Sequence, residues 1–179
     1  MSRMEIYAIG PNAIVNQNIY GEPHNAFGGA IHIWTTLGEK YGTNFSLFNP
    51  DPTWKAIDRM EERDRWAMGF TFDMVVVRKS ELPTLIRHLV SFAKDYPTPT
   101  LDECIDVLRR ARNDSNVEAV CFNHTSVSES PWVVYDSDDE CDEGRGFDLN
   151  KDKGAWYLTE ESIRREEAME YQNQEKGPF

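Results

Sequence analysis

Cysteine and positive charge are both scarce in this chain of 179 residues. The three cysteines, Cys104, Cys121 and Cys141, form no closely spaced pair, which argues against a disulfide framework and against a paired-thiol zinc site. The chain has 19 Lys and Arg against 31 Asp and Glu, so its formal net charge is -12. Because proteins that grip phosphates do so with Lys and Arg, this deficit disfavours direct binding to nucleic acid or to anionic lipid.

Long hydrophobic runs and an export signal are missing as well. No apolar stretch approaches the length of about 20 residues that a membrane-spanning helix needs. Met1 to Val15 mixes charged and polar residues into apolar ones, which leaves no secretory core. We therefore expect a cytoplasmic protein with reduced thiols and no membrane partner. No HExxH, P-loop, GxGxxG, CxxC or GxSxG signature occurs, so the sequence predicts no bound cofactor.

What the chain does contain is enough apolar material for one core. A hydrophobic content of 40% at this length predicts a single domain over residues 1–158, followed by a charged C-terminal helix and tail over 159–179. Apolar residues recur at helical spacing over residues 25–41, 51–63, 80–95 and 100–112. Strand patterns occur over residues 4–9, 70–77, 117–122, 131–135 and 155–158. This mixture predicts an α+β fold, a mainly antiparallel sheet with about four to five helices packed on it.

Several local patterns give sharper expectations. The run FTFDMVVV, residues 70–77, predicts a central strand, and the Asn-rich stretch that ends at Pro23 predicts a loop. Residues 117–122 and 131–135 predict the two strands of a hairpin with a long loop. Thr100 and Glu103 have the spacing of a capping box. The charged run EERDR, residues 61–65, predicts the solvated end of a helix.

The most distinctive feature is residues 136–143, which we call the acidic segment. The last 51 residues of the chain contain 15 acidic and 6 basic residues, and the acidic segment contributes Asp136, Asp138, Asp139, Glu140, Asp142 and Glu143. Crowded carboxylates can neither pack in a core nor pair with one another, so they belong at the surface. We interpret the segment as a docking surface for a basic surface of a protein partner, such as a nucleic-acid-binding protein. The alternative is a solvated loop that only keeps the protein soluble.

A second candidate site centres on a histidine at the end of an apolar strand. His124 is followed by the hydroxyls of Ser126 and Ser128. With a carboxylate such as Asp73 folded nearby, it would form an acid/base centre for a small hydrolase or transferase. The alternative is a polar hairpin loop whose hydroxyls bond to its own backbone.

A third pattern places oxygen ligands at alternate positions, as a calcium loop does, in Asp148, Asn150 and Asp152. The match is defective because Lys153 intervenes before the glycine and Thr159 occupies the place of the final glutamate of an EF-hand. An ordinary turn is therefore favoured, and we predict no metal site.

Tryptophans suggest a further alternative, a structural or oligomeric subunit. If Trp66, Trp132 or Trp156 were exposed, each could anchor an interface.

Three segments, NAFGGAIHIW, FTFDMVVVR and NHTSVSESPWVV, follow one another in the chain. In that order they resemble small uncharacterised accessory proteins carried by phages and other mobile elements, over about residues 25–135. The resemblance implies a setting in which small acidic proteins inhibit or modulate a host factor, and it assigns no residue roles. The sequence thus favours a non-enzymatic binding protein over an enzyme.

Overall fold

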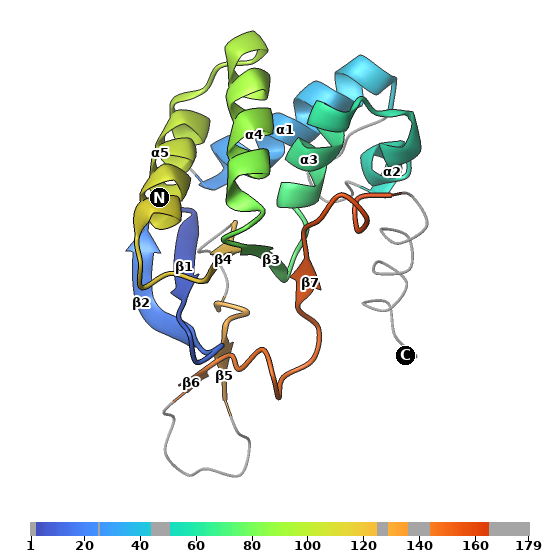
Figure 1. The fold of residues 1–179 in the computed structure, drawn as a ribbon. Coiled ribbons are helices and arrows are strands. Elements are labelled where there is room, and N and C mark those ends of the chain that lie inside the picture. The colour runs from blue at the N-terminus through green and yellow to red at the C-terminus, as the bar shows by residue number, and fades with distance from the viewer. Residues whose placement is uncertain (1–2, 25, 44–50, 125–128, 136–143, 165–179) are drawn as a thin grey trace.

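The computed structural model describes residues 3–24, 26–43, 51–124, 129–135 and 144–164 of the chain. Over these ranges five α-helices pack on a five-stranded, mainly antiparallel sheet (Figure 1). The predicted α+β fold is therefore confirmed.

The main sheet joins segments from both ends of the chain in the order β2-β1-β4-β3-β7. Its strands are β1 (Glu5–Ile9), β2 (Val15–Gly21), β3 (Val75–Arg78), β4 (Ala119–Asn123) and β7 (Trp156–Tyr157). Neighbouring strands are antiparallel except for β3 and β7, which are parallel. The pairing of Ile6 with Phe122 shows how distant in sequence the two innermost partners are.

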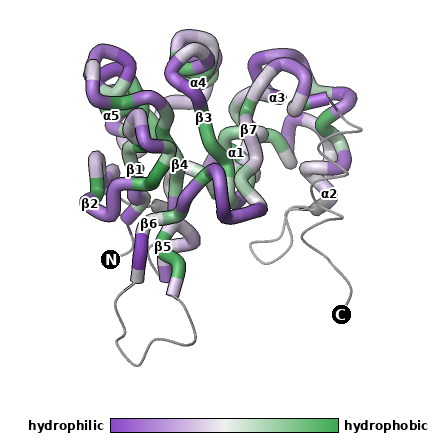
Figure 2. Tube along the Cα trace, turned by 60° about the horizontal axis from the view of Figure 1, so that its bottom comes forward, coloured by the Kyte–Doolittle hydropathy of each residue, from purple (hydrophilic) through white to green (hydrophobic). Residues whose placement is uncertain are grey.

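Helices cover one face of this sheet (Figure 1). They are α1 (Ala26–Tyr41), α2 (Asp51–Trp54), α3 (Glu62–Phe70), α4 (Leu82–Asp95) and α5 (Pro99–Asn113), with a short 3-10 helix at Ile57–Arg59. Helix α1 is followed by Gly42 at φ +68°, a left-handed conformation that glycine adopts without strain. Hydrophilic residues dominate the outer sides of α3, α4 and α5, whereas β3 and β4 are largely hydrophobic (Figure 2).

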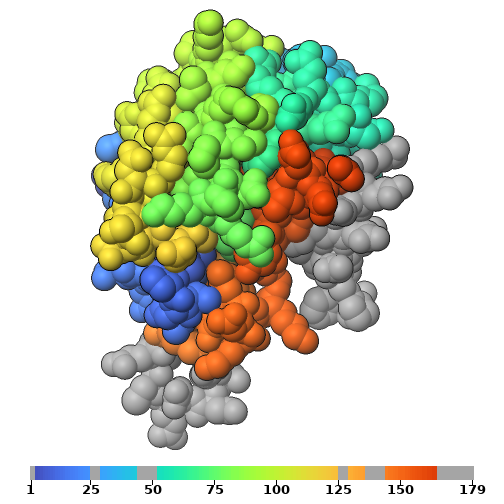
Figure 3. Space-filling view, in the orientation of Figure 1, coloured from blue at the N-terminus to red at the C-terminus, as the bar shows by residue number. Residues whose placement is uncertain are grey.

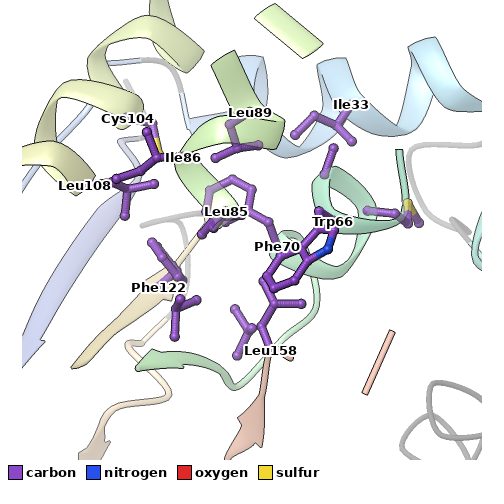
Figure 4. Packing of buried hydrophobic residues seen from close by; sticks show 14 of the residues in the cluster. Ile33, Trp66, Phe70, Leu85, Ile86, Leu89, Cys104, Leu108, Phe122 and Leu158 are labelled. Carbon is purple, nitrogen blue, oxygen red and sulfur yellow. The ribbon is translucent and has the colours of Figure 1, made fainter. Parts of the chain in front are cut away.

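The main core lies between the helices and the sheet. Side chains alternate along a strand, so Ile6, Val77 and Phe122 point toward the helices. They meet the apolar stripes of α3, α4 and α5, among them Trp66, Phe70, Leu85, Ile86, Leu89, Cys104 and Leu108 (Figure 4). Each fully buried side chain of this size contributes about 1.5–3 kcal/mol to folding.

A smaller core lies on the opposite face of the sheet. Here the alternate strand residues Tyr7, Ile9, Val76, Ala119 and Cys121 are covered by Trp132 and Phe147. These two residues adjoin β5 (Val133–Val134) and β6 (Arg145–Gly146), which form a separate antiparallel pair. We call this pair the small sheet, and it is the part of the fold that positions the ends of the acidic segment.

Two predictions about strands near the N-terminal half are wrong in part. The stretch before Pro23 is not only a loop, because it contains β2 at the edge of the sheet. Helix α3 extends to Phe70, and the central strand begins only at Val75, after Met74 at φ +56°. Trp66, Ala67 and Phe70 continue a helical stripe into the main core, and this packing overrides the alternation of residues 70–74.

Other local expectations also fail. Residues 117–122 and 131–135 do not form a hairpin, because β4 pairs with β1 and β3 whereas β5 pairs with β6. The helix expected over residues 51–63 is divided into α2 and the 3-10 helix, and α3 begins at Glu62. Helix α5 starts at Pro99, so no capping box forms. The Thr100 hydroxyl instead donates to the backbone oxygen of His24, and Glu103 accepts from the His24 backbone nitrogen.

The core also extends beyond residue 158. Leu158 and Ile163 are both buried in the main cluster, so the first turns after β7 belong to the packed body.

Candidate functional site

The acidic segment lies outside the described residues, but the structure shows how both of its ends are held. Residues 136–143 connect β5 to β6, in which Val134 stands opposite Arg145 and Val133 opposite Gly146. The two ends of the segment are therefore fixed beside each other. In Figure 1 these strands lie at the end of the molecule remote from the helices.

The small sheet is fastened to the main sheet through both of its strands. The fully buried Trp132 donates from Nε1 to the Phe122 backbone oxygen at 2.7 Å, and its ring meets Phe147 edge to face. The Val15 backbone nitrogen donates to the oxygen of Phe147 at 2.9 Å. At Gly146 an added Cβ would lie 2.2 Å from the Val15 oxygen, so only glycine permits this close approach.

The base that follows the acidic segment is already neutralised. The Arg145 guanidinium donates to both carboxylate oxygens of Asp152, each at 2.8 Å. This pairing, together with the Asp148 backbone N–H, lowers the pKa of Asp152 to about 2. The two parallel hydrogen bonds fix the Arg145 guanidinium against Asp152, which ties the end of β6 to the turn that follows it.

The same contacts explain the residues of the calcium alternative. Asp148 Oδ1 accepts from the Asn150 backbone nitrogen at 2.9 Å, and Asp152 Oδ2 accepts from the Asp148 nitrogen at 2.7 Å. These carboxylates therefore stabilise a turn, and Asp152 holds a guanidinium where a calcium ligand would hold a cation. In the described ranges, no group of three or more His, Cys, Asp and Glu side chains is arranged to hold a metal ion.

His124 lies between two phenylalanine rings rather than in an open site. Its ring is stacked on Phe122 and meets Phe70 edge to face, with centroid distances of 5.7 and 4.9 Å. Its Nε2 lies 2.8 Å from the Phe70 backbone oxygen, and since a carbonyl only accepts, Nε2 carries the proton. Desolvation lowers the pKa of His124 to about 4, so the imidazole is neutral at pH 7.

The second ring nitrogen of His124 is the acceptor that an acid/base centre would need. Nδ1 is buried and has no hydrogen-bond partner among the described residues, so no bond joins His124 to Asp73. Asp73 lies in the turn after α3 and is exposed, although desolvation on its packed side raises its pKa. Ser126 and Ser128 lie outside the described residues. This geometry does not favour the hydrolase or transferase alternative.

The three tryptophans that could anchor an interface if they were exposed are buried, so they do not supply the anchors of the structural or oligomeric alternative. Trp66 and Trp132 are fully buried, and Trp156 is 7% exposed. Trp66 stacks on His88, and Trp156 packs against Phe72. Their large apolar area fills the two cores instead of an interface.

A buried charge cluster escaped the sequence interpretation. Asp64, expected at the solvated end of a helix, is fully buried. It accepts from Lys40 Nζ at 2.6 Å, Tyr41 Oη at 2.7 Å and Arg63 Nε at 3.0 Å. Desolvation alone would raise the pKa of Asp64, but these three donors hold it below the usual carboxyl range. The cluster ties α1 to α3. Its one sequence signal is that Asp64 follows Met60 by four residues and precedes Ala67 by three, in the apolar stripe.

Comparison with known proteins found no matching family model, no matching curated protein and no matching solved structure. Among the helices of the described ranges, none combines the length and the apolar character needed to cross a membrane.

Proposed function

We propose that this protein is a non-enzymatic binding protein that docks on a basic surface of a protein partner through the acidic segment. The observation that carries the proposal is the concentration of six carboxylates within residues 136–143, with no Lys or Arg among them. Such a cluster makes the local electrostatic potential strongly negative, which steers a cationic surface toward it.

The contacts around the segment support this use. The strands that flank it, β5 and β6, are held together by their pairing. Trp132 and Phe147 anchor those strands to a packed core, which gives the segment a rigid base.

A nucleic-acid-acting host factor is the partner that this chemistry suits. A protein surface that binds phosphates is rich in Lys and Arg, and carboxylates can occupy it in their place. Binding there would exclude the nucleic acid, so inhibition is the expected consequence. The resemblance to accessory proteins of phages and mobile elements supports this setting.

The test compares two variants that lose the same number of charges. In one, the six acids of the acidic segment become Asn or Gln. In the matched control, six exposed acids elsewhere are changed in the same way: Glu39, Glu62, Asp102, Asp106, Glu160 and Glu161. Each protein serves as bait for capture from its native cell, and the association rate of the captured partner is then measured with purified components.

We expect the wild type and the control to capture the same partner and the segment variant to lose it. Its association rate should fall by about tenfold or more at low salt, with a flatter dependence on ionic strength. Equal capture and equal association rates for the segment variant and the wild type would overturn the proposal.

A further inference from the structure

A pocket of about 510 Å³ opens on the side of the main sheet that carries the small sheet. Its floor follows one row across three strands, in which Ala119 stands between Ile9 and Arg78. Because side chains alternate, Arg78 lies on the same face as Val76, a member of the smaller core. Because the Ala119 side chain is shorter than those of Ile9 and Arg78 on either side, it leaves a depression in the floor of the pocket.

The walls come from segments that are far apart in the chain. The turn after β1 contributes Gly10 and Pro11, the start of α4 is preceded by Ser80, and the turn before β7 contributes Leu149 and Asn150. These blue, green and orange segments adjoin one another on the face shown in Figure 3.

Of the two cations that line this pocket, Arg78 is the one whose charged group stands on an aromatic ring. Its guanidinium carbon lies 4.1 Å from the centre of the Tyr157 ring, so the aromatic face holds it in position. No described residue accepts a hydrogen bond from the guanidinium, and Arg78 is exposed. Lys79 differs, because its Nζ donates to the Asp114 backbone oxygen at 2.6 Å. One ring-supported guanidinium is thus available at the edge of an apolar floor.

We propose that this pocket binds a small monocarboxylate with an aromatic or other apolar body. A guanidinium pairs with a carboxylate through two parallel hydrogen bonds, and Ile9, Ala119 and Leu149 offer apolar surface to the rest of the molecule. The volume falls within the range of about 300–1,000 Å³ that is typical of small-molecule sites. This site is separate from the acidic segment and does not depend on its role.

The charges of the lining decide between a monoanion and a dianion. Arg78 offers a guanidinium that no described residue engages by a hydrogen bond, whereas the Lys79 ammonium is directed to the Asp114 backbone oxygen and the exposed Glu118 adds a negative charge at the rim. A phosphate monoester would bring a second negative charge toward Glu118, while the Lys79 ammonium is directed toward Asp114. A carboxylate is therefore preferred.

The experiment uses 2-naphthoate as the probe, with 2-naphthamide and naphthyl phosphate as analogues. Binding to the full chain is followed by the backbone amide shifts of residues 78–80 and 149–157 in NMR spectra. A probe of this size should bind with a dissociation constant of about 1 mM. The amide, which lacks the charge, should bind about tenfold more weakly.

Four variants test which residues of the pocket bind the probe. Arg78→Gln should weaken naphthoate about tenfold, Glu118→Gln should tighten it, and the matched control Arg112→Gln on exposed α5 should leave it unchanged. Ala119→Leu should fill the floor of the pocket and abolish binding. If the Ala119→Leu protein does not fold, the affinity of Arg78→Gln tests the proposal by itself. Absence of naphthoate binding, equal affinity for naphthoate and naphthamide, tighter binding of naphthyl phosphate, or unchanged affinity in Arg78→Gln would each overturn the proposal.

Discussion

The burial of His124 predicts that this protein loses stability when the pH falls from 7.5 to 4.5. The folded state keeps the imidazole neutral, with a pKa of about 4, whereas a histidine in the unfolded chain has a pKa of about 6.5. Between these values the unfolded chain binds a proton that the folded protein excludes, so acid favours unfolding. Protonation of the unfolded chain lowers the free energy of unfolding by about 2.5 kcal/mol at pH 4.5 and has almost no effect on it at pH 7.5.

A His124→Phe variant isolates this contribution. Phenylalanine keeps a flat ring between Phe70 and Phe122, but it cannot donate to the Phe70 backbone oxygen and does not titrate. At pH 7.5 the variant should be less stable than the wild type by about 1–2 kcal/mol, because it leaves that oxygen without its donor. At pH 4.5 the order should reverse, since protonation of His124 in the unfolded chain destabilises only the wild type.

The measurement is urea unfolding of both proteins at the two pH values, followed by the fluorescence of the buried tryptophans. Other titrating groups are common to the two proteins, so they cancel in the difference between their free energies of unfolding. NMR titration of the His124 ring in the folded wild type supplies an independent value. A difference between the two proteins that stays constant with pH, or a folded-state pKa near 6.5, would refute the reasoning.

Further changes test other parts of the structure. Asp64→Asn removes the buried carboxylate that pairs with Lys40 and Arg63, which keep their exposed partners Glu61 and Asp95, and should lower the free energy of unfolding by about 3 kcal/mol in urea titrations. Glu62→Gln on the exposed side of the same helix should change it by less than about 0.5 kcal/mol. The stabilisation from Asp64, whose pKa is lowered, should be present above the usual carboxyl range and should be lost as the pH falls through its lowered value. Gly146→Ala drives a Cβ into a backbone oxygen and should lower the melting temperature, whereas Gly29→Ala meets only a methyl group at 3.7 Å and should stabilise α1 by up to about 1 kcal/mol. The carboxyl carbon of Asp152 should titrate at about pH 2 by NMR, and Arg145→Gln should move that value toward the ordinary range.

The parts of the fold that could be predicted are those in which local pattern and tertiary packing agree. Helices α4 and α5 carry one continuous apolar stripe each, and their sequence boundaries differ from the structure by a residue or two. Residues 70–74 show why other parts could not be predicted. Phe70 and Phe72 suit both an alternating strand and a helical stripe, and the choice depends on the neighbours of Trp66, which are remote in sequence.

The candidate sites also differ in how far the sequence alone predicts them. The charge of the acidic segment is visible in the sequence because it needs no partner within the chain. The pocket beside Arg78 was not predictable, since it exists only when Ile9, Ala119 and Tyr157 are brought together by strand pairing. Asp64 was placed at a solvated end because its lysine and tyrosine partners come from another helix.

The position of β1 in the sheet has a consequence for biosynthesis. This strand is translated before the rest of the main sheet, yet its inner neighbour β4 begins only at Ala119, so β1 lacks this partner until residues 10–118 have been translated. At about 5–20 residues per second, that delay lasts several seconds, during which one side of the β1–β2 ribbon stays unpaired. The parallel partner of β3 arrives later still, at Trp156. Nascent chains halted before Trp156 should therefore fail to complete the main sheet, and they should depend on chaperones that shield unpaired strand edges.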